Sequence, residues 1–187
     1  MLAVVLAVGQ LARAQETSLS LDPEKTTVSF TLEATLHTVH GTFRLKSGAI
    51  RFDPSTGSAS GTVVIDAASG QTGNRKRDRN MLRDVLVSER YPEIIFTPTR
   101  VVGTVTSRGD SSVQVEGVFR LLGTDHATTL PFQVRADGSE LRATSQFAVP
   151  YVAWGLKNPS TFFLHVADKV ELSVAANGKL TSAAAQR

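Results

Sequence analysis

The chain has no cysteine among its 187 residues. This absence excludes a disulfide framework, a thiolate metal site and a cysteine nucleophile, and it leaves the redox compartment open. Beyond the N-terminus, no stretch approaches the roughly 20 consecutive apolar residues that a transmembrane helix needs, so the sequence predicts no transmembrane segment. Aromatic residues are scarce at 6%, so the positions of the few phenylalanines are informative.

Strong charge of one sign is also missing. The formal net charge is +3, which is too little for a general nucleic-acid binder. The one basic run, Arg75–Arg79, is interrupted by Asp78 and has few aromatic neighbours. We therefore expect no nucleic-acid partner. A hydrophobic content of 41% without any linker-like run predicts a single domain with one core over residues 15–187.

The N-terminus contains the features of an export signal. Leu2 to Val8 form a short apolar run, and Ala12-Arg13-Ala14 has the small-x-small form of a signal-peptidase site. We expect a signal peptide over residues 1–14 and a periplasmic or secreted mature protein. An ordinary apolar N-terminal helix is the alternative.

Apolar and polar residues alternate along most of the mature chain, as in strands with one buried face. Between residues 26 and 35, for example, Val28, Phe30 and Leu32 share one face. The apolar phase then shifts, which predicts a bulge near Gly48. Hairpin-length turns predict an all-β, antiparallel sheet closed into a barrel of about eight strands, with a β-sandwich as the alternative. The expected strands cover residues 26–35, 43–52, 63–65, 94–105, 113–121, 130–136, 141–149 and 164–174, with a turn at 107–112 and a frayed tail from Thr181.

One segment, Thr72 to Leu86, has helical rather than strand periodicity. Its apolar residues Met81, Leu82 and Val85 fall on one face, and Thr72 or Asn74 can cap its first turn. We expect this segment to form a helical flap over one end of the barrel.

The first turn of that helix carries positive charge where the helix dipole favours negative charge. An anionic ligand would relieve the conflict, which makes Arg75, Lys76 and Arg79 candidate contacts for an anionic head group. The alternative is a solvated basic face without a ligand.

Catalytic and metal-binding patterns are not found. The segment Gly57–Gly61 resembles a nucleophile elbow, but Ala59 occupies the nucleophile position. His37 and His40, three residues apart on a strand, point to opposite faces. No pair of carboxylates shares a face. We expect a non-enzymatic protein with no catalytic residue, no metal and no cofactor.

The apolar face of the strands carries most of the phenylalanines, which makes them candidates for lining an apolar lumen, although packing in a filled core is the alternative reading of each. They are Phe30, Phe43, Phe96, Phe119, Phe132 and Phe147.

A series of short motifs in this order resembles the YceI-like family over nearly the whole mature chain. They are Val28-x-Phe30, Gly41-x-Phe43, Phe52-Asp53, Ile65-Asp66, Thr72-Gly73, Arg77-Asp78, Tyr91-Pro92-x-Ile94-x-Phe96, Leu122-Gly123 and Val166-x-Asp168-x-Val170. The resemblance implies an extended lipocalin-like barrel, exported, that binds polyisoprenoids or related lipids in its lumen without a cofactor. Where many members have Arg-x-Asp-Phe-Gly, this chain has residues 151–155, whose Trp154 we add to the candidate lumen contacts.

These observations predict an exported carrier or reservoir that holds a long-chain lipid. The alternative is a structural or interaction module with a filled barrel, whose basic helix meets an acidic partner or a membrane surface. A homodimer is compatible with either.

We predict that an exporting host cleaves the chain between Ala14 and Gln15, because the small-x-small site follows the apolar run directly. N-terminal sequencing of the secreted or periplasmic protein checks this, with Ala14→Arg as a variant whose cleavage should fail. A wild-type chain that starts at Met1 and stays in the cytoplasm contradicts the prediction.

Overall fold

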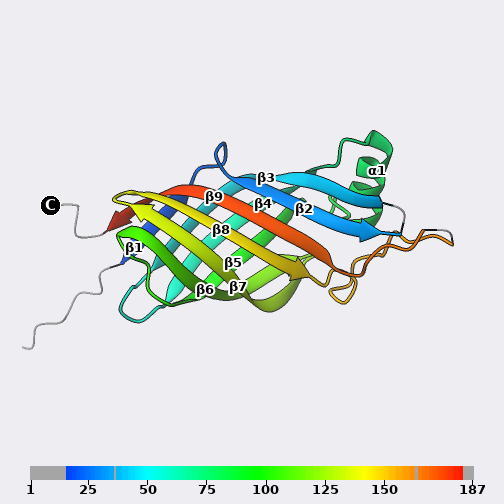
Figure 1. The fold of residues 1–187 in the computed structure, drawn as a ribbon. Coiled ribbons are helices and arrows are strands. Elements are labelled where there is room, and N and C mark those ends of the chain that lie inside the picture. The colour runs from blue at the N-terminus through cyan, green and yellow to red at the C-terminus, as the bar shows by residue number, and fades with distance from the viewer. Residues whose placement is uncertain (1–15, 36, 163, 183–187) are drawn as a thin grey trace, which may run out of the picture.

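The computed structural model describes residues 16–35, 37–162 and 164–182 and shows an elongated barrel of antiparallel strands (Figure 1). Nine strands form one sheet, which confirms the predicted fold class. The strands are β1 (Thr17–Leu21), β2 (Thr27–Ala34), β3 (His37–Phe52), β4 (Ala59–Gln71), β5 (Glu93–Val102), β6 (Arg108–Leu121), β7 (Thr124–Asp137), β8 (Glu140–Val149) and β9 (Val170–Ser182). A short helix, α1 (Arg75–Asn80), continues as the π-helical turn η1 (Met81–Val85).

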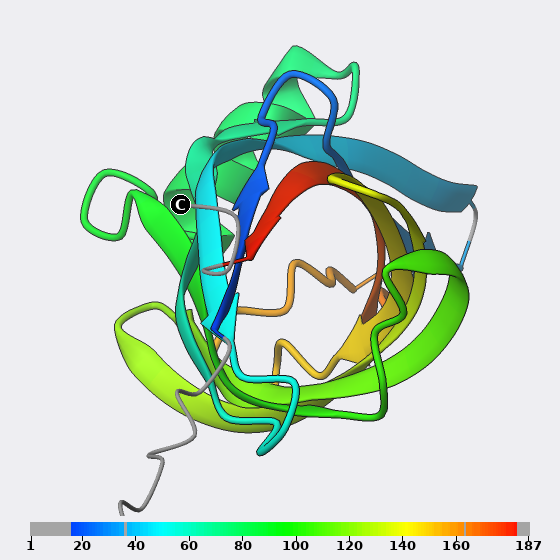
Figure 2. The ribbon, with the colours of Figure 1, turned by 90° about the vertical axis from the view of Figure 1, so that its left-hand side faces the viewer.

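The nine strands make a ring of eight positions because β1 and β2 share one of them (Figure 2). Both strands lie between β3 and β9. β2 pairs with the first part of β3, from Val28–Phe43 to Ala34–His37, whereas β1 pairs with its last part, from Thr17–Phe52 to Ser20–Ala49. β1 therefore closes the ring at one end and β2 at the other. The sequence did not predict β1, because five residues are too few for a clear alternation.

Hydrogen bonds to Asn177 of β9 hold the turn between β1 and β2. The Asp22 amide donates to the Asn177 carbonyl at 2.8 Å, and the Asn177 side-chain amide donates to the Lys25 carbonyl at 2.5 Å. The Asn177 amide donates to Thr26 Oγ1 at 3.3 Å. The turn thus remains in the wall although the strand pairing is interrupted there.

The predicted phase shift in β3 is confirmed, close to the expected position near Gly48. Leu45 pairs with Ile65 and Ser47 pairs with Val64, so Lys46 is the extra residue of the bulge rather than Gly48. Lys46 forms an ion pair with Glu93 at 2.5 Å on the outside of the barrel. A bulged residue that is polar and faces solvent keeps both flanking apolar stretches directed inward.

Many expected boundaries differ from the structure: β3 starts at His37 rather than 43, β4 covers Ala59–Gln71 rather than 63–65, β5 ends at Val102 rather than 105, and β7 starts at Thr124 rather than 130. The turn predicted at 107–112 lies earlier, because β6 already starts at Arg108. The last strand was expected at 164–174 with a frayed tail, but β9 starts at Val170 and extends to Ser182, where it pairs with β1. Residues 164–169 belong instead to the β8–β9 connection. Pairing with β1, which the sequence did not reveal, keeps the C-terminal part of β9 in the sheet.

The helical flap is confirmed but is shorter than Thr72 to Leu86. Asn74 is the cap, and its Oδ1 accepts from the amides of Lys76 and Arg77, both at 3.1 Å. From Met81 the helix widens into a π-turn, in which the Leu86 amide donates to the Met81 carbonyl. Among the described residues, no helix has the length and apolarity needed to cross a membrane.

β7 and β8 separate towards the end of the barrel that carries α1. Their ladder stops at Gln133–Thr144, and Ser145 Oγ then donates to the Pro131 carbonyl at 2.5 Å. Trp154, which follows β8, lies parallel to the ring of His126 on the separated part of β7, with centroids 4.3 Å apart and an interplanar angle of 4°. Trp154 thus packs the segment that follows β8 against His126 of β7 and Phe119 of β6 where backbone pairing between β7 and β8 has ended.

The long β8–β9 connection crosses the same end of the barrel, as Figure 2 shows along the axis. The buried Tyr151 hydroxyl donates to the Ala167 carbonyl at 2.7 Å, and the Asn158 side-chain amide donates to Asp168 at 2.7 Å. Burial, with a smaller contribution from the Asp168 carboxylate, raises the pKa of Tyr151 to about 12. These bonds fix the connection as part of the rim.

We predict that Trp154→Ala lowers the free energy of unfolding by about 3 kcal/mol, because a large ring that packs on His126 and Phe119 is lost. Trp154→Phe keeps an aromatic ring and should cost less than about 1.5 kcal/mol. Chemical denaturation measures both values. If the alanine variant unfolds at the wild-type denaturant concentration, the packing of Trp154 on His126 and Phe119 does not stabilise the fold.

The raised pKa of Tyr151 predicts a loss of stability at alkaline pH. Between about pH 10 and about pH 12 the unfolded chain releases the phenolic proton while the folded chain keeps it, so the contribution is complete below this window and is lost as the pH rises. Tyr151→Phe has no such proton. The difference in unfolding free energy between wild type and this variant should shrink across that range, and a constant difference contradicts a buried phenol.

Candidate functional site

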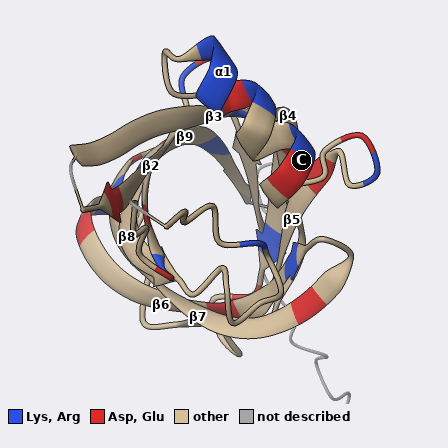
Figure 3. Ribbon diagram, turned by 90° about the vertical axis from the view of Figure 1, so that its right-hand side faces the viewer, with Lys and Arg blue, Asp and Glu red and all other residues tan. Residues whose placement is uncertain are grey.

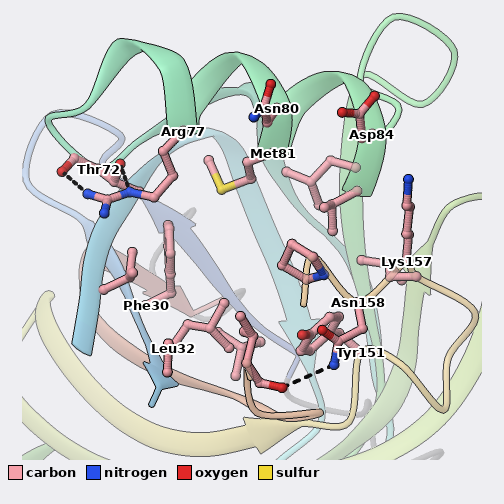
Figure 4. Close-up of a pocket in the computed structure, with 18 of the residues that line it drawn as sticks. Phe30, Leu32, Thr72, Arg77, Asn80, Met81, Asp84, Tyr151, Lys157 and Asn158 are labelled. Carbon is pink, nitrogen blue, oxygen red and sulfur yellow. Dashed lines mark hydrogen bonds between the residues drawn. The ribbon is translucent and has the colours of Figure 1, made fainter. Parts of the chain in front are cut away.

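The interior of the barrel is hollow. A cavity of about 600 Å³, which we call the outer chamber, opens at the end that carries α1 and the β8–β9 connection (Figure 4). Apolar side chains form its walls and polar side chains form its mouth. The apolar wall includes Phe30, Leu32, Val39, Phe43, Met81, Leu86, Phe119, Leu121, Val149, Leu156, Val166 and Leu172.

A second cavity of about 200 Å³, the inner chamber, lies towards the end that β1 closes. Of the described residues that line it, Thr26 alone has a polar side chain. The others are aliphatic or aromatic and include Leu19, Leu21, Phe52, Phe96, Val113, Phe132, Ala143, Phe147 and Ala176.

All six phenylalanines proposed as lumen contacts face one or both chambers. Phe30 lines the outer chamber, and Phe43 and Phe119 line both. The inner chamber holds the remaining three, Phe96, Phe132 and Phe147. Period-two alternation was sufficient to place them, because one face of every strand points inward. That they touch a ligand stays a prediction.

Trp154 lines neither chamber. Its ring is engaged by His126 and Phe119, with the Phe119 centroid 5.5 Å away. The sequence indicated an aromatic residue near the barrel wall. It did not indicate that β7 and β8 separate there, which is what lets the indole pack on His126. Its direct contact with a ligand remains a prediction that the geometry does not support.

Three of the phenylalanine rings that face the lumen pack against glycines of the barrel wall. A Cβ on Gly41 would lie 2.3 Å from Phe30 Cζ, and one on Gly117 would lie 2.7 Å from Phe96 Cζ. At Gly70 a Cβ would lie 2.6 Å from Phe43 Cε1. Each ring therefore rests against bare backbone, and the volume along the axis stays empty.

Three cationic side chains line the mouth of the outer chamber: Lys76 and Arg77 from α1, and Lys157 from the β8–β9 connection. Arg77 is half-buried and oriented, since its Nε donates to Thr72 Oγ1 at 2.7 Å and its Nη2 to the Thr72 carbonyl at 3.1 Å (Figure 4). In the part of the chain that the structure describes, none of the three has a carboxylate within 4 Å.

Asp84 is the carboxylate at the same mouth, and its charge is already compensated. Arg83 donates from Nε and Nη2 to its two oxygens, each at 2.7 Å. These bonds, together with the charges of Arg83 and Lys157, hold the pKa of Asp84 below its usual range. The mouth therefore keeps excess positive charge, which is available to an anionic group. Figure 3 shows the basic residues of α1 at this end of the barrel.

The predicted head-group residues do not come together in one place. Lys76 lines the mouth, whereas Arg75 and Arg79 are exposed and do not line the cavity. The reason is the geometry of a six-residue helix that continues into a π-turn, which directs Arg77 and Asp84 towards the mouth. The sequence analysis missed Arg77 and Lys157 as mouth residues. The Arg77-Asp78 pair of the family motif could have indicated Arg77, whereas no pattern in the sequence indicated Lys157.

The histidines do not assemble a metal site. His37 is at the mouth, and His40 Nδ1 lies 3.1 Å from Thr31 Oγ1 on the strand pair. Within residues 16–35, 37–162 and 164–182, no group of three or more histidine or acidic side chains could hold a metal ion.

Solved structures show where this architecture recurs. BcnA from Burkholderia cenocepacia superposes with a TM-score of 0.68 at 19% identity, over 84% of this chain and 98% of that one. A polyisoprenoid-binding domain from Saccharophagus degradans gives a TM-score of 0.63 at 16% identity, over 87% and 98%. The YceI protein of Campylobacter jejuni gives 0.60 at 18% identity, over 78% and 86%. At these identities the likeness establishes the fold.

A search of curated proteins finds no match to this sequence. A comparison with protein-family models, in contrast, matches the YceI-like domain over residues 19–177. That range begins in β1 and ends in β9, so it includes the whole ring of strands together with the flap. The chain belongs to the YceI-like domain family.

Proposed function

We propose that this protein is an exported, non-catalytic carrier or reservoir that holds a polyisoprenoid or a related long-chain amphiphile in its lumen. The observation that carries the proposal is a hollow apolar lumen under a mouth with uncompensated positive charge. The tail lies inside the barrel and an anionic head remains at the mouth. Export rests on the signal-like residues 1–14, which lie outside the described part of the chain.

The dimensions of the lumen favour a long apolar tail. The outer chamber alone has a volume of about 600 Å³, within the range of roughly 300–1,000 Å³ usual for ligand pockets. Each methylene moved from water to such a wall contributes about 0.8 kcal/mol. A tail that fills the chamber therefore has ample driving force without any polar contact.

The alternative, an interaction module with a filled barrel, has less support. A filled barrel requires close-packed side chains along the axis, whereas Phe30, Phe43 and Phe96 lie back against glycines and leave two cavities. The structurally similar domain from Saccharophagus degradans is a polyisoprenoid-binding domain. This precedent in a protein of the same fold supports the same ligand class here.

The charges at the mouth favour an anionic rather than a neutral head. Lys76 on α1 and Lys157 on the β8–β9 connection both line the outer chamber. An anion between them gains attraction from both, and Arg77 has N–H groups beyond those that bind Thr72. A phosphate or carboxylate fits this arrangement.

We predict that the double variant Lys76→Gln/Lys157→Gln binds farnesyl diphosphate about five- to tenfold more weakly than wild type, because two partly exposed charge contacts of about 0.5–0.7 kcal/mol each are lost. Affinity for farnesol, which lacks the charge, should stay within about twofold. Isothermal titration at low and moderate salt measures both ligands, and the difference should shrink as salt screens the charges.

The double variant Arg75→Gln/Arg79→Gln is a matched control, since it removes the same charge from residues that do not line the cavity. It should bind both ligands like wild type. A selective loss in this control instead would assign the head group to the outward arginines that the sequence suggested. If neither double variant distinguishes diphosphate from alcohol, the mouth does not bind an anionic head.

A further inference from the structure

Four side chains line both chambers and therefore lie at the boundary between them: Phe43, Ile94, Phe119 and Leu172. They come from β3, β5, β6 and β9, which are distributed around the ring rather than clustered on one wall. We call this set the collar. Phe119 is buried, with 8% of its surface exposed, and the other three are partly buried.

We infer that the inner chamber is a second binding site, for uncharged apolar groups only, and that the collar divides bound chains into two length classes. Short tails occupy the outer chamber, and longer tails pass the collar and end in the inner chamber. The inference rests on the proposed function for the amphiphile, but the inner chamber as a site for an apolar molecule stands without it.

The composition of the inner chamber supports this assignment. Its lining contains no charged side chain among the described residues, and Thr26 alone contributes a hydroxyl. A water molecule in a cavity needs roughly two to four polar partners, so an apolar cavity of this kind stays dry and takes up hydrophobic molecules. A volume of about 200 Å³ is adequate for one aromatic ring or the end of a prenyl chain.

The collar can move because of how Phe43 is held. Its ring lies over Gly70, beside the methyl group of Met81 in η1, and its centroid is 5.3 Å from that of Phe30. A Cβ on Gly70 would meet both Phe43 Cε1 at 2.6 Å and Met81 Cε at 2.8 Å. Phe43 is therefore supported by bare backbone and a flexible methionine, and neither confines a ring as a close-packed core does.

Two variants test this inference, one by widening the collar and one by filling the inner chamber. Leu172→Ala widens the collar without removing a mouth residue, and Ala143→Trp fills the inner chamber, where Ala143 is buried in the wall. Val134→Ala, also on the inner wall, is the control for a cavity-forming substitution away from the collar. Circular dichroism establishes that each variant is folded.

The experiment titrates wild type and variants with geranyl, farnesyl, geranylgeranyl and octaprenyl diphosphate, and separately with toluene. In wild type, affinity should rise about fourfold per buried methylene for short chains, level off when the outer chamber is full, and rise again for octaprenyl diphosphate. Leu172→Ala should remove the plateau and bind octaprenyl diphosphate at least fivefold more tightly. Ala143→Trp should lose the second rise, and Ala143→Trp and Val134→Ala, which change residues that do not line the outer chamber, should bind the geranyl ligand like wild type.

Toluene reports on the inner chamber independently of any amphiphile. With the outer chamber occupied by geranyl diphosphate, wild type should still bind toluene and Ala143→Trp should not. Without geranyl diphosphate, wild type should bind more toluene than Ala143→Trp. If prenyl diphosphates do not bind but toluene does, the proposed function fails while the second site stands. If Ala143→Trp binds toluene and octaprenyl diphosphate like wild type, the inner chamber is not a site and the inference is overturned.

Discussion

The structure depends on keeping an apolar lumen empty inside a closed ring of strands. Protein interiors normally pack to the density of organic crystals, and a void forfeits contacts on its lining. Here the wall itself makes room, because Gly41, Gly70 and Gly117 lack the Cβ atoms that would push Phe30, Phe43 and Phe96 towards the axis. The rings cover exposed backbone and line the cavity together. A side chain at any of these glycines would displace the aromatic ring that packs against it, and the ring would then fill part of the empty lumen.

Closure of the ring is achieved differently at its two ends, and the difference gives the lumen a direction. At one end β1 completes the ring by pairing with β3 and β9. At the other, β7 and β8 separate, and Trp154, the β8–β9 connection and the flap replace strand pairing. Side chains and loops offer polar groups that a continuous ladder does not. The charged mouth is therefore located where backbone pairing ends.

Much of the barrel follows from local pattern, since alternation placed Phe30, Phe119 and Phe147 on the inner face and turn chemistry separated the strands. The features that the sequence did not predict share a physical cause, because each depends on residues that are distant along the chain. β1 exists through its pairing with the end of β9, Trp154 is used where β7 diverges from β8, and Arg77 reaches the mouth because α1 is short and widens into a π-turn. None of these is encoded within a window of neighbouring residues.

Charge and apolar surface together would determine how the proposed amphiphile is oriented in the lumen. Burying an ionised phosphate in the inner chamber, which offers one hydroxyl, costs far more than any tail contact returns, so the head stays at the mouth. In the proposed complex Lys76 and Lys157 would be the cations beside the head, while Asp84 is occupied by Arg83. A bound tail also removes the void and stabilises the folded state in proportion to its affinity. In the proposed function, the contacts that the lining of the empty lumen forgoes in the free protein would be made with the tail.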